Sequence, residues 1–382
     1  MKKILMFTAN YWNSPFKVGS HHIAENLTQK GWHVGYVSDP ISPFHFLNWN
    51  FQLKDRLKIF SSGGRFEKKN LWTYVPFSFI TPNNKPLLRH NYVYKNWVKY
   101  TVPSLYNTIK KNGFHDVDIL YFDSAIFEPI LDKIKYKKSV FRIADNYAGF
   151  DKYNNNLDEA IDRLSKKVDT VLYTAFSLKD YVSKFSPKDL FYFPNGVDFK
   201  HFNKNNLPKP HEFNKISNPI VLYIGAIDVW FDFDLLNFLV KSLPQLEFVL
   251  IGPKEIAEKR LEKRDNLHLL GRKAFEDLPK YIQHSDVGII PFDIKNYGTL
   301  VNNINPLKLY EYMAGGLPVV SVEWSELKHL KSPAYLSRSY EEFKNNLITA
   351  LQEKKEKSYY QNYARNFDWS TRVDSLINYL FK

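Results

Sequence analysis

Short apolar runs alternate along the chain with stretches of helical periodicity, and many of the runs end in a polar or small residue. The chain opens with an apolar run at residues 3–7, a helical pattern at residues 20–30 that ends at Gly31, and a second run at residues 34–37. Apolar runs of this length are typical of buried strands, and glycine is favoured just beyond the end of a helix. We therefore predict a strand, a helix and a parallel strand, which is the opening unit of an α/β sheet.

Further apolar runs in the first half predict the rest of this sheet, and they cover residues 119–122, 140–144, 171–173 and 191–193. The carboxyl ends of parallel strands meet at one edge of a sheet, where α/β folds bind their ligands. Polar residues follow these runs, so we expect Asp123, Asp145 and Asn195 to converge at that edge.

Asp145 is our candidate for a general base, and Asp123 is the reserve. A carboxylate at this edge can take the proton from an attacking hydroxyl group. The alternative is that Asp145 caps a following helix. His21 and His22 lie in the first turn of the helix at residues 20–30, at the same edge, where either can contact a sugar or a phosphate. A histidine in that place can also be solvated or structural.

The second half repeats the pattern, but its strands end in glycine. Three apolar runs precede Gly225, Gly252 and Gly271. A glycine at a strand end lets a ligand approach the backbone closely. Residues 203–218 are polar and contain proline, as expected of a linker. A chain of 382 residues is long enough for two domains with separate cores, and two Rossmann-like halves fit this length.

Residues 305–320 combine a helix with charged side chains at its amino end. Pro306 suits the first helical position, and two glycines suit the end of the helix about two turns later. Lys308 and Glu311 are three residues apart, so they share one face. Free N–H groups, the helix dipole and Lys308 can hold a phosphate, and Glu311 can accept hydrogen bonds from sugar hydroxyl groups. These groups suit a nucleotide-diphosphate sugar; the alternative is an ordinary ion pair on a surface helix.

The same stretch resembles the donor-site helix of the GT-B glycosyltransferases, in which an acidic residue is followed by a short apolar run, Ala-x-Gly and Pro-Val-Val. The version Asn-Pro-Leu-Lys-Leu-Tyr-Glu-Tyr at residues 305–312 is closer to that of bacterial exopolysaccharide and teichuronic-acid transferases, including the xanthan-type glucuronosyltransferases. Pro-Asn-Gly-Val-Asp at residues 194–198 resembles the segment that closes the first domain in many of these enzymes. The resemblance covers most of the chain after about residue 115.

The resemblance implies an α/β protein with the GT-B fold, in which two Rossmann-like, doubly wound domains face a cleft. We expect an acceptor-binding domain at residues 1–200, a donor-binding domain at residues 201–365, and a C-terminal helix at residues 366–382 that can cross back to the first domain. In this scheme Asp145 takes the proton and Lys308 stabilises the departing diphosphate. The other donor-binding residues that we expect are Glu311, Asn303, Gly225, Gly271, Arg272, Phe292 and Tyr310. Asp123, His21 and His22 are expected to contact the acceptor or a sugar.

Two departures from the family pattern change the expected chemistry. Asn303 stands where retaining relatives carry a second glutamate, which favours inversion at the anomeric carbon. The loop at residues 226–231 lacks the Arg and Lys that commonly bind the donor phosphates, so this task falls on Lys308 and backbone amides. Asp232-Phe233-Asp234 imitates the D-x-D metal motif of another transferase fold, but Asp232 is better suited to cap the next helix. We therefore expect neither a metal nor another cofactor.

Charge is concentrated in the first part of the chain. The formal net charge is +13, and residues 1–100 contain 14 basic but only 4 acidic side chains. Aromatic and basic residues are mixed at residues 44–58 and 89–100, and residues 87–101 can form an amphipathic helix. Such mixtures suit an anionic membrane surface, and the alternative is that the aromatic rings are core and the lysines are solvated. No nucleic-acid-binding motif accompanies the charge, so nucleic acid is not expected as a partner.

The chain has no cysteine, its first apolar run is too short for a signal peptide, and no run reaches the length of a spanning helix. We expect a cytoplasmic protein, peripheral at the inner face of the cell membrane. The predicted function is transfer of a sugar from a nucleotide-diphosphate sugar to a lipid-linked or membrane-proximal saccharide in the synthesis of a cell-surface polysaccharide. One alternative is a nucleotide-sugar 2-epimerase on the same fold, and another is a non-catalytic binding or assembly subunit.

Overall fold

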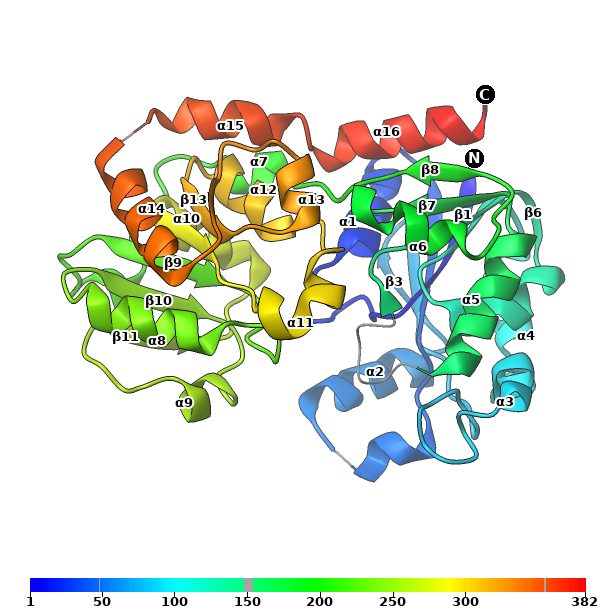
Figure 1. Cartoon of the computed structure of the whole chain (residues 1–382). Coiled ribbons are helices and arrows are strands. Elements are labelled where there is room, and N and C mark those ends of the chain that lie inside the picture. Colours follow the sequence, from blue (N-terminus) through cyan, green and yellow to red (C-terminus); the bar gives the residue numbers. More distant parts are fainter. Residues whose placement is uncertain (48, 148–153, 354) are drawn as a thin grey trace. The chain divides into compact units, whose positions relative to one another are not determined.

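The computed structural model describes residues 1–47, 49–147, 154–353 and 355–382. The chain forms two compact units (Figure 1). Unit 1 contains Met1–Pro194 and Val373–Lys382, and unit 2 contains Asn195–Arg372. None of the helices in these described parts has both the length and the apolar character that a bilayer-spanning helix requires.

Unit 1 is built on a sheet whose described strands lie in the order β3-β4-β2-β1-β5-β6-β7-β8. All pairs are parallel except β3 with β4, which are antiparallel. The strands are β1 (Lys3–Thr8), β2 (His33–Ser38), β3 (Arg65–Lys68), β4 (Leu71–Tyr74), β5 (Asp116–Phe122), β6 (Lys135–Ile143), β7 (Thr170–Tyr173) and β8 (Leu190–Tyr192). The sheet confirms the strands predicted in the first half of the chain.

Helices cover both faces of this sheet, with α1 on one face and α4 and α5 on the other (Figure 1). The α-helices are α1 (Gly19–Gln29), α2 (Phe51–Ser61), α3 (Asn91–Asn96), α4 (Leu105–Lys111), α5 (Asn155–Lys167) and α6 (Lys179–Ser183). Short 3-10 helices are η1 (Pro43–Leu47), η2 (Trp97–Tyr100), η3 (Ala125–Lys133) and η5 (Phe176–Leu178). The last helix, α16 (Trp369–Leu380), starts in unit 2 and ends in unit 1, where the Tyr379 hydroxyl donates to Asp189 over 2.7 Å.

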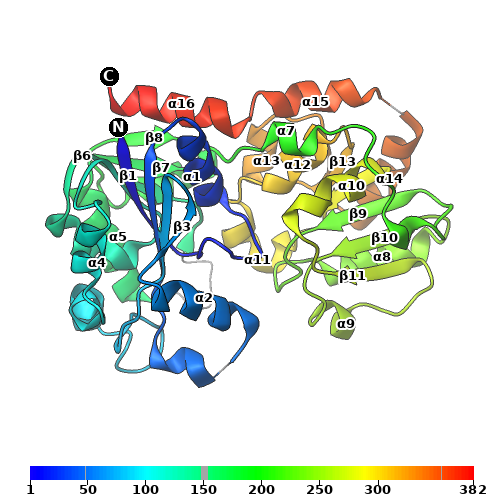
Figure 2. The same ribbon diagram turned by 180° about the vertical axis from the view of Figure 1, so that it is seen from behind.

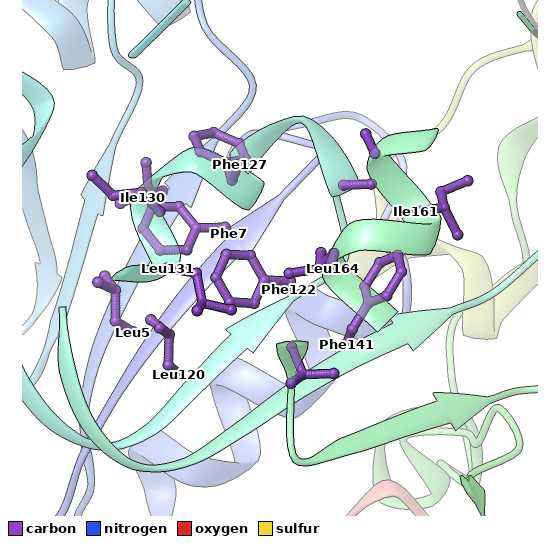
Figure 3. Packing of buried hydrophobic residues seen from close by; sticks show 14 of the residues in the cluster. Leu5, Phe7, Leu120, Phe122, Phe127, Ile130, Leu131, Phe141, Ile161 and Leu164 are labelled. Atoms are coloured by element: carbon purple, nitrogen blue, oxygen red, sulfur yellow. The ribbon is translucent and has the colours of Figure 1, made fainter. Parts of the chain in front are cut away.

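The main core of unit 1 lies between the sheet, η3 and α5 (Figure 3). Phe7 on β1 stacks on Phe122 of β5 at 5.2 Å between ring centroids, and lies 4.7 Å from Phe127 of η3. Ile161 and Leu164 of α5 complete this side, and each is fully buried. Alternate residues of a strand face opposite sides of the sheet, so this packing fixes the position of β5 and β6. It thereby fixes where the residues that follow these two strands leave the carboxyl edge.

Unit 2 contains a parallel sheet with the order β11-β10-β9-β12-β13-β14 among the described strands. Its strands are β9 (Ile220–Ile224), β10 (Glu247–Ile251), β11 (Leu267–Gly271), β12 (Val287–Ile290), β13 (Val319–Val322) and β14 (Tyr335–Ser337). Its helices are α7 (Phe199–Phe202), η6 (His211–Phe213), α8 (Phe233–Ser242), α9 (Ala257–Arg260), η7 (Phe275–Asp277), α10 (Leu278–Gln283), α11 (Ile294–Val301), α12 (Leu307–Ala314), α13 (Ser325–His329), α14 (Tyr340–Glu353) and α15 (Lys357–Arg365).

The sheet of unit 2 buries apolar residues on both faces. In Figure 2, α7, α10, α12 and α15 lie on one side of the strands and α8 on the other. One core joins α12 and α15 to the sheet, and the other joins α8 and α14 to it. A parallel sheet covered on both faces is the doubly wound arrangement that the sequence predicted for this half.

Two local predictions need correction. Residues 87–101 do not form one helix, because Leu87 has a positive φ of 70° and the helical segment divides into α3 and η2. Pro306 is the N-cap of α12 and not its first helical residue, so the helix begins at Leu307. Its end agrees with the prediction, since Gly316 has a φ of 80° and the N–H groups of Gly316 and Leu317 bond back to the last turn.

Candidate active site

Helix α12 is fixed to the centre of the unit 2 sheet by Tyr312. The Tyr312 hydroxyl accepts a 2.7 Å hydrogen bond from the N–H of Ile224, the last residue of β9. Its ring lies over Gly288 of β12, where an added Cβ would come within 2.5 Å of the ring. The amino end of α12 therefore lies at the junction of β9 and β12, where the strand order reverses and α/β folds bind their ligands.

Lys308, in the first turn of α12, points its side chain across the end of β9. A Cβ added to Gly225 would lie 2.3 Å from Lys308 Cε and 2.7 Å from Nζ. The ammonium group lies 5.2 Å from the ring centroid of Phe292 and 5.4 Å from that of Tyr223. Within the part of the chain that the structure describes, this group has no hydrogen-bonded or ion-paired carboxylate. Burial lowers the pKa of Lys308 to about 8, although the Glu311 carboxylate acts in the opposite direction.

Glu311 lies one turn further along the same face. Its carboxyl group, like Lys308, is half-buried, and none of the described residues forms a hydrogen bond or ion pair with it. Burial raises its pKa to about 7, and the positive charge of Lys308 opposes this rise. No described side chain caps the helix, so the N–H groups of its first turn are also left for a ligand. A cation, free N–H groups and a carboxyl group at one helix end can hold an anion and a neighbouring hydroxyl group.

Asn305, which the sequence analysis did not single out, fixes the segment that leads into α12. Its side chain accepts from the Asn195 N–H at 3.1 Å and from the Tyr310 hydroxyl at 3.1 Å, and donates to Glu326 at 2.8 Å. Asn305 is only 2% exposed, so these bonds replace contacts with water. The signal available in the sequence was the Asn-Pro pair itself, because the residue before a proline adopts an extended conformation and cannot extend the helix.

The glycines predicted to contact the donor lie at strand ends, and their backbones are unusual. Gly225 and Gly271 have φ values of 152° and 71°, which favour glycine. Gly225 lies directly under the Lys308 side chain, whereas a Cβ at Gly271 would meet Lys254 at 3.1 Å. Arg272, next to Gly271, is exposed. The structure thus brings Gly225, Lys308 and Glu311 together, and places Gly271 and Arg272 two strands away along the sheet edge.

The remaining predicted donor-binding residues mainly make contacts within unit 2 and expose little surface to a ligand. Tyr310 is fully buried, with its ring stacked on Phe367 at 4.5 Å, so its side chain supports Asn305 and does not face a ligand. Phe292 is 3% exposed and contacts Lys308, which makes it a wall beneath the ammonium group and leaves little ring surface for a nucleotide base. Asn303 is half-buried and donates to the carbonyl of Thr299 within α11.

At the carboxyl edge of unit 1, the side chain of Asp123 is held by a buried ion pair with Arg142 and by a hydrogen bond from Tyr121. Its Oδ1 accepts from the Tyr121 hydroxyl at 3.1 Å and from Arg142 Nη1 at 3.2 Å. The side chains of Arg142 and Asp123 are 5% and 9% exposed. A carboxylate fixed in this way holds the Tyr121 hydroxyl and the Arg142 guanidinium in place at this edge. Arg142 was not among the predicted site residues, although its signal is visible in the sequence as a basic residue inside the apolar run at residues 140–144.

Asp145 follows β6 at the same edge and is half-buried. Burial raises its pKa to about 6, with Asp123 adding to the rise and Arg142 opposing it. None of its described neighbours forms a hydrogen bond with its carboxyl group. A carboxylate with this pKa is mostly ionised at neutral pH, and it still binds a proton more readily than an ordinary aspartate. Of the two predicted carboxylates, Asp145 is the one whose surroundings suit a general base.

His21 of α1 is held by hydrogen bonds within the protein. His21 Nδ1 accepts from the Val18 N–H at 3.2 Å, so its neutral ring carries the proton on Nε2, which donates to the Tyr11 carbonyl at 3.1 Å. Burial lowers the pKa of His21 to about 4. Both ring nitrogens are therefore engaged within the protein, contrary to the expectation of a sugar or phosphate contact. His22 is 3% exposed.

Asn195, which was predicted to converge with Asp123 and Asp145, is not part of unit 1. It belongs to unit 2, where its side-chain amide donates to the Asn305 carbonyl at 2.8 Å. Asp232, in contrast, caps α8 as expected and accepts from the Leu235 N–H at 2.8 Å. It also lines a cavity of about 700 Å³ in unit 2, together with the carboxyl groups of Asp234, Asp293 and Glu323 and the basic side chains of Lys295 and Arg338. Arg338 is paired with Glu323, and the carboxyl groups outnumber the basic groups, so this cavity suits a diphosphate less well than Lys308 and α12 do.

Comparison with known proteins identifies the class to which this fold belongs. Residues 6–174 match the family described as glucuronosyltransferase GumK, N-terminal domain, and residues 218–353 match the family of glycosyl transferases group 1. HepE of Anabaena, solved with UDP-glucose, aligns with a TM-score of 0.65 and 16% identity over 100% of this chain and 99% of its own. Sucrose-phosphate synthase of Thermosynechococcus elongatus aligns with a TM-score of 0.65 and 14% identity over 98% and 95% of the two chains. The chain therefore has the GT-B fold.

Within that class the sequence relatives are more specific. TuaH of Bacillus subtilis, provisionally named a teichuronic acid biosynthesis glycosyltransferase, is 24% identical over 197 residues, which are 48% of this chain. The match spans about half of the length of that relative, 49%. Together with the two family matches, it confirms the predicted resemblance to GT-B glycosyltransferases of the exopolysaccharide and teichuronic-acid kind.

Proposed function

We propose that the protein is a glycosyltransferase that moves a sugar from a nucleotide-diphosphate sugar to a hydroxyl group of a saccharide acceptor. The observation that carries this proposal is the half-buried Lys308 at the uncapped amino end of α12, close to the Glu311 carboxyl group and over Gly225. Even partial burial of an ammonium group that has no hydrogen-bonded carboxylate is unfavourable for folding, and an anionic ligand at a helix start would offset that cost. UDP is our choice of nucleotide, because HepE binds UDP-glucose on the same fold.

The proposed reaction is a single displacement. The acceptor oxygen forms a bond to the anomeric carbon while the bond between that carbon and the diphosphate oxygen breaks, and the configuration inverts. Asp145 takes the proton from the acceptor hydroxyl group, and Lys308 with the first N–H groups of α12 binds the diphosphate as its charge grows. Glu311 accepts hydrogen bonds from sugar hydroxyl groups. The chemistry requires no metal, because fixed positive groups neutralise the leaving group.

Calorimetry with UDP and a panel of UDP-sugars tests the donor site. Wild-type protein should bind, and Lys308→Ala should weaken binding by roughly 10²-fold, since a hydrogen bond between charged groups contributes about 1.5–3 kcal/mol. Lys241→Ala, which removes an exposed lysine of α8, is the matched control and should change nothing. If no nucleotide sugar binds, a scaffold role replaces the enzyme. Turnover of the sugar without an acceptor would instead identify the 2-epimerase.

We further propose that unit 1 docks on an anionic membrane surface, where it meets a lipid-linked acceptor of polysaccharide synthesis. The side chains of Phe44, Phe46, Leu47 and Phe51 are between 42% and 75% exposed, along η1 and the start of α2. Lys54 and Lys58, both exposed, follow on α2. Apolar and basic side chains on one short segment match the interface of an anionic bilayer.

Sedimentation with vesicles tests this docking. Vesicles that contain phosphatidylglycerol should carry the protein down at low salt and release it at high salt, because the attraction between charges is screened. The double change Leu47→Ser and Phe51→Ser should abolish sedimentation. Phe66→Ser, which removes another exposed ring of unit 1 on β3, should not. Equal sedimentation of all three proteins would reject η1 and α2 as the docking segment.

A further inference from the structure

A cavity of about 360 Å³ opens in unit 1 beside the carboxyl ends of β1 and β2. Its walls come from the loop after β1, the residues after β2, η1, α2 and the loop before α3. The lining side chains that carry this argument are Tyr11, Asp39, His45, Gln52 and Arg56. None of them was assigned above to the transfer of the sugar.

Asp39 presents one free carboxyl oxygen in this cavity. Its Oδ1 accepts from the Ser124 hydroxyl at 2.9 Å, while Oδ2 has no hydrogen-bond partner among the described residues. Burial raises the pKa of Asp39 to about 7, with Ser124 and Arg56 opposing the rise. The backbone of Asp39 is fixed, since its N–H donates to the Thr8 carbonyl at 2.9 Å. A hydrogen-bond acceptor held in place in this way favours a ligand that brings hydroxyl donors.

Arg56 and His45 supply donors next to this acceptor. Arg56 Nη2 donates to the carbonyls of Asp39 and Pro40 at 2.8 and 3.0 Å, which locks the guanidinium plane and leaves Nη1 and Nε without partners in the described chain. His45 Nδ1 accepts from the Ser42 N–H at 3.0 Å, so the neutral ring carries its proton on Nε2. The Gln52 amide adds a donor and an acceptor, and it has no hydrogen bond to the described residues.

The wall after β1 is rigid because buried side chains fix its backbone. Thr8 and Tyr36 each donate to the Asn10 carbonyl at 3.0 Å. His21 donates to the Tyr11 carbonyl and so fixes the backbone of this wall residue. Such support keeps a binding site in one geometry before the ligand arrives, which lowers the entropy lost on binding.

We propose that this cavity holds an uncharged, hydroxyl-rich sugar ring of the acceptor, with Asp39 and Arg56 as the residues that determine its specificity. Each sugar hydroxyl group donates one hydrogen bond and accepts others, which matches a wall that alternates between a carboxylate oxygen, N–H donors and amides. An anionic group such as a phosphate would meet the guanidinium but also the Asp39 carboxylate. The volume of the cavity falls within the usual range for small-ligand sites. The assignment to an acceptor rests on the proposed transferase function.

Saturation-transfer NMR on the full chain tests the proposal with methyl hexosides as probes, and with methyl glucuronide and inorganic phosphate as the charged competitors. At least one methyl hexoside should bind to wild-type protein in the presence of UDP. Asp39→Asn and Arg56→Lys should each weaken that binding by roughly tenfold or more, as expected for the loss of a charge-assisted hydrogen bond. Asp116→Asn is the control, because its side chain is half exposed at the opposite end of β5 and pairs with Lys135.

The outcomes separate this inference from the proposed function. Equal hexoside binding by wild-type protein and Asp39→Asn would overturn the inference, and so would phosphate binding that depends on Arg56. Either result would leave Lys308-dependent UDP-sugar binding intact. If Asp39→Asn does not fold, Gln52→Ala replaces it, because Gln52 can be shortened without breaking a described hydrogen bond. Weaker hexoside binding by Gln52→Ala supports the site, and unchanged binding overturns it.

Discussion

The two sheets end at their carboxyl edges in opposite kinds of chemistry. In unit 1 the strands β2, β5 and β6 are followed by the carboxylates of Asp39, Asp123 and Asp145. In unit 2 the strands β9, β10 and β11 end in or precede glycines, and the charge comes from Lys308 on a helix. The same sheet architecture therefore places carboxyl groups at the ligand-binding edge in one unit, and glycines with a cation at that edge in the other. Fold alone does not distinguish these uses; the residues at the strand ends do.

The largest effect should come from the carboxylate edge. Asp145→Asn removes the proposed base and should lower kcat by roughly 10²–10⁴-fold, while donor binding stays unchanged. In the wild-type enzyme, kcat/KM should fall as the pH drops below about 6, because Asp145 becomes protonated there. Steady-state kinetics with calorimetry of UDP-sugar binding measure both effects. Asp116→Asn is again the control. Full activity of Asp145→Asn would show that Asp145 is not the general base.

Donor binding by Lys308, at the carboxyl edge of the unit 2 sheet, should weaken as the pH rises, which is opposite to the pH dependence expected from Asp145. The pKa of Lys308 is about 8, so its charge is present below this pH and is lost as the pH rises through it. Donor affinity should therefore fall by roughly tenfold or more between pH 7 and pH 9.5, because a charged hydrogen bond to the diphosphate is lost. Calorimetry at a series of pH values measures this decline. Lys308→Ala should bind the donor weakly, and its affinity should depend little on pH. If the affinity of this variant falls with pH by as much as that of the wild type, another titrating group is responsible.

A substitution of Gly225 tests whether donor binding needs a residue without a side chain at the end of β9. A Cβ at this position would collide with the Lys308 side chain, and its φ of 152° disfavours any other residue. Gly225→Ala should weaken donor binding by about tenfold. Gly31→Ala carries the backbone strain of a positive φ without a collision, since nothing lies within 4 Å of its added Cβ. A donor affinity that is normal in both variants would mean that Gly225 is only a turn residue.

The smallest effect should be on stability. Because burial lowers the pKa of Lys308 from 10.5, the folded state binds fewer protons than the unfolded state between about pH 8 and 10.5. The free energy of unfolding thus rises with pH in this window, and at pH 6 the charged Lys308 destabilises the fold. Lys308→Met should raise Tm at pH 6 by a few degrees, which corresponds to about 1 kcal/mol. Lys241→Met is the control. A lower Tm for Lys308→Met would show that the ammonium group already has a stabilising partner.

Much of the fold followed from periodicity. The strand runs before residues 123, 145, 174 and 225 and the helix after Pro306 were predicted from apolar length, glycine and proline alone. Residues 40–115 were not readable, because proline interrupts the pattern and β3 and β4 are only four residues each. A polar residue after a strand marks the carboxyl edge at Asp123 and Asp145, and it does so at Asp39 as well, beside the cavity of unit 1.

Local pattern could not decide which polar side chains are already engaged. Tyr310 and Lys308 are two positions apart on α12, yet one is fully buried in the core and the other is half-buried at the helix start. His21 is bound on both nitrogens by backbone groups 3 and 10 residues away. These outcomes depend on tertiary packing, which the sequence pattern of one element does not contain.

The phenol of Tyr312 takes the N–H of Ile224, at the place where β9 would otherwise bond to β12. The two central strands of unit 2 are therefore joined through a side chain at this level, beyond the pairs Val287–Val221 and Gly288–Leu222. The ring fits there because Gly288 has no side chain. A larger residue at Gly288, deep in the interior, would displace Tyr312 and with it the helix that carries Lys308.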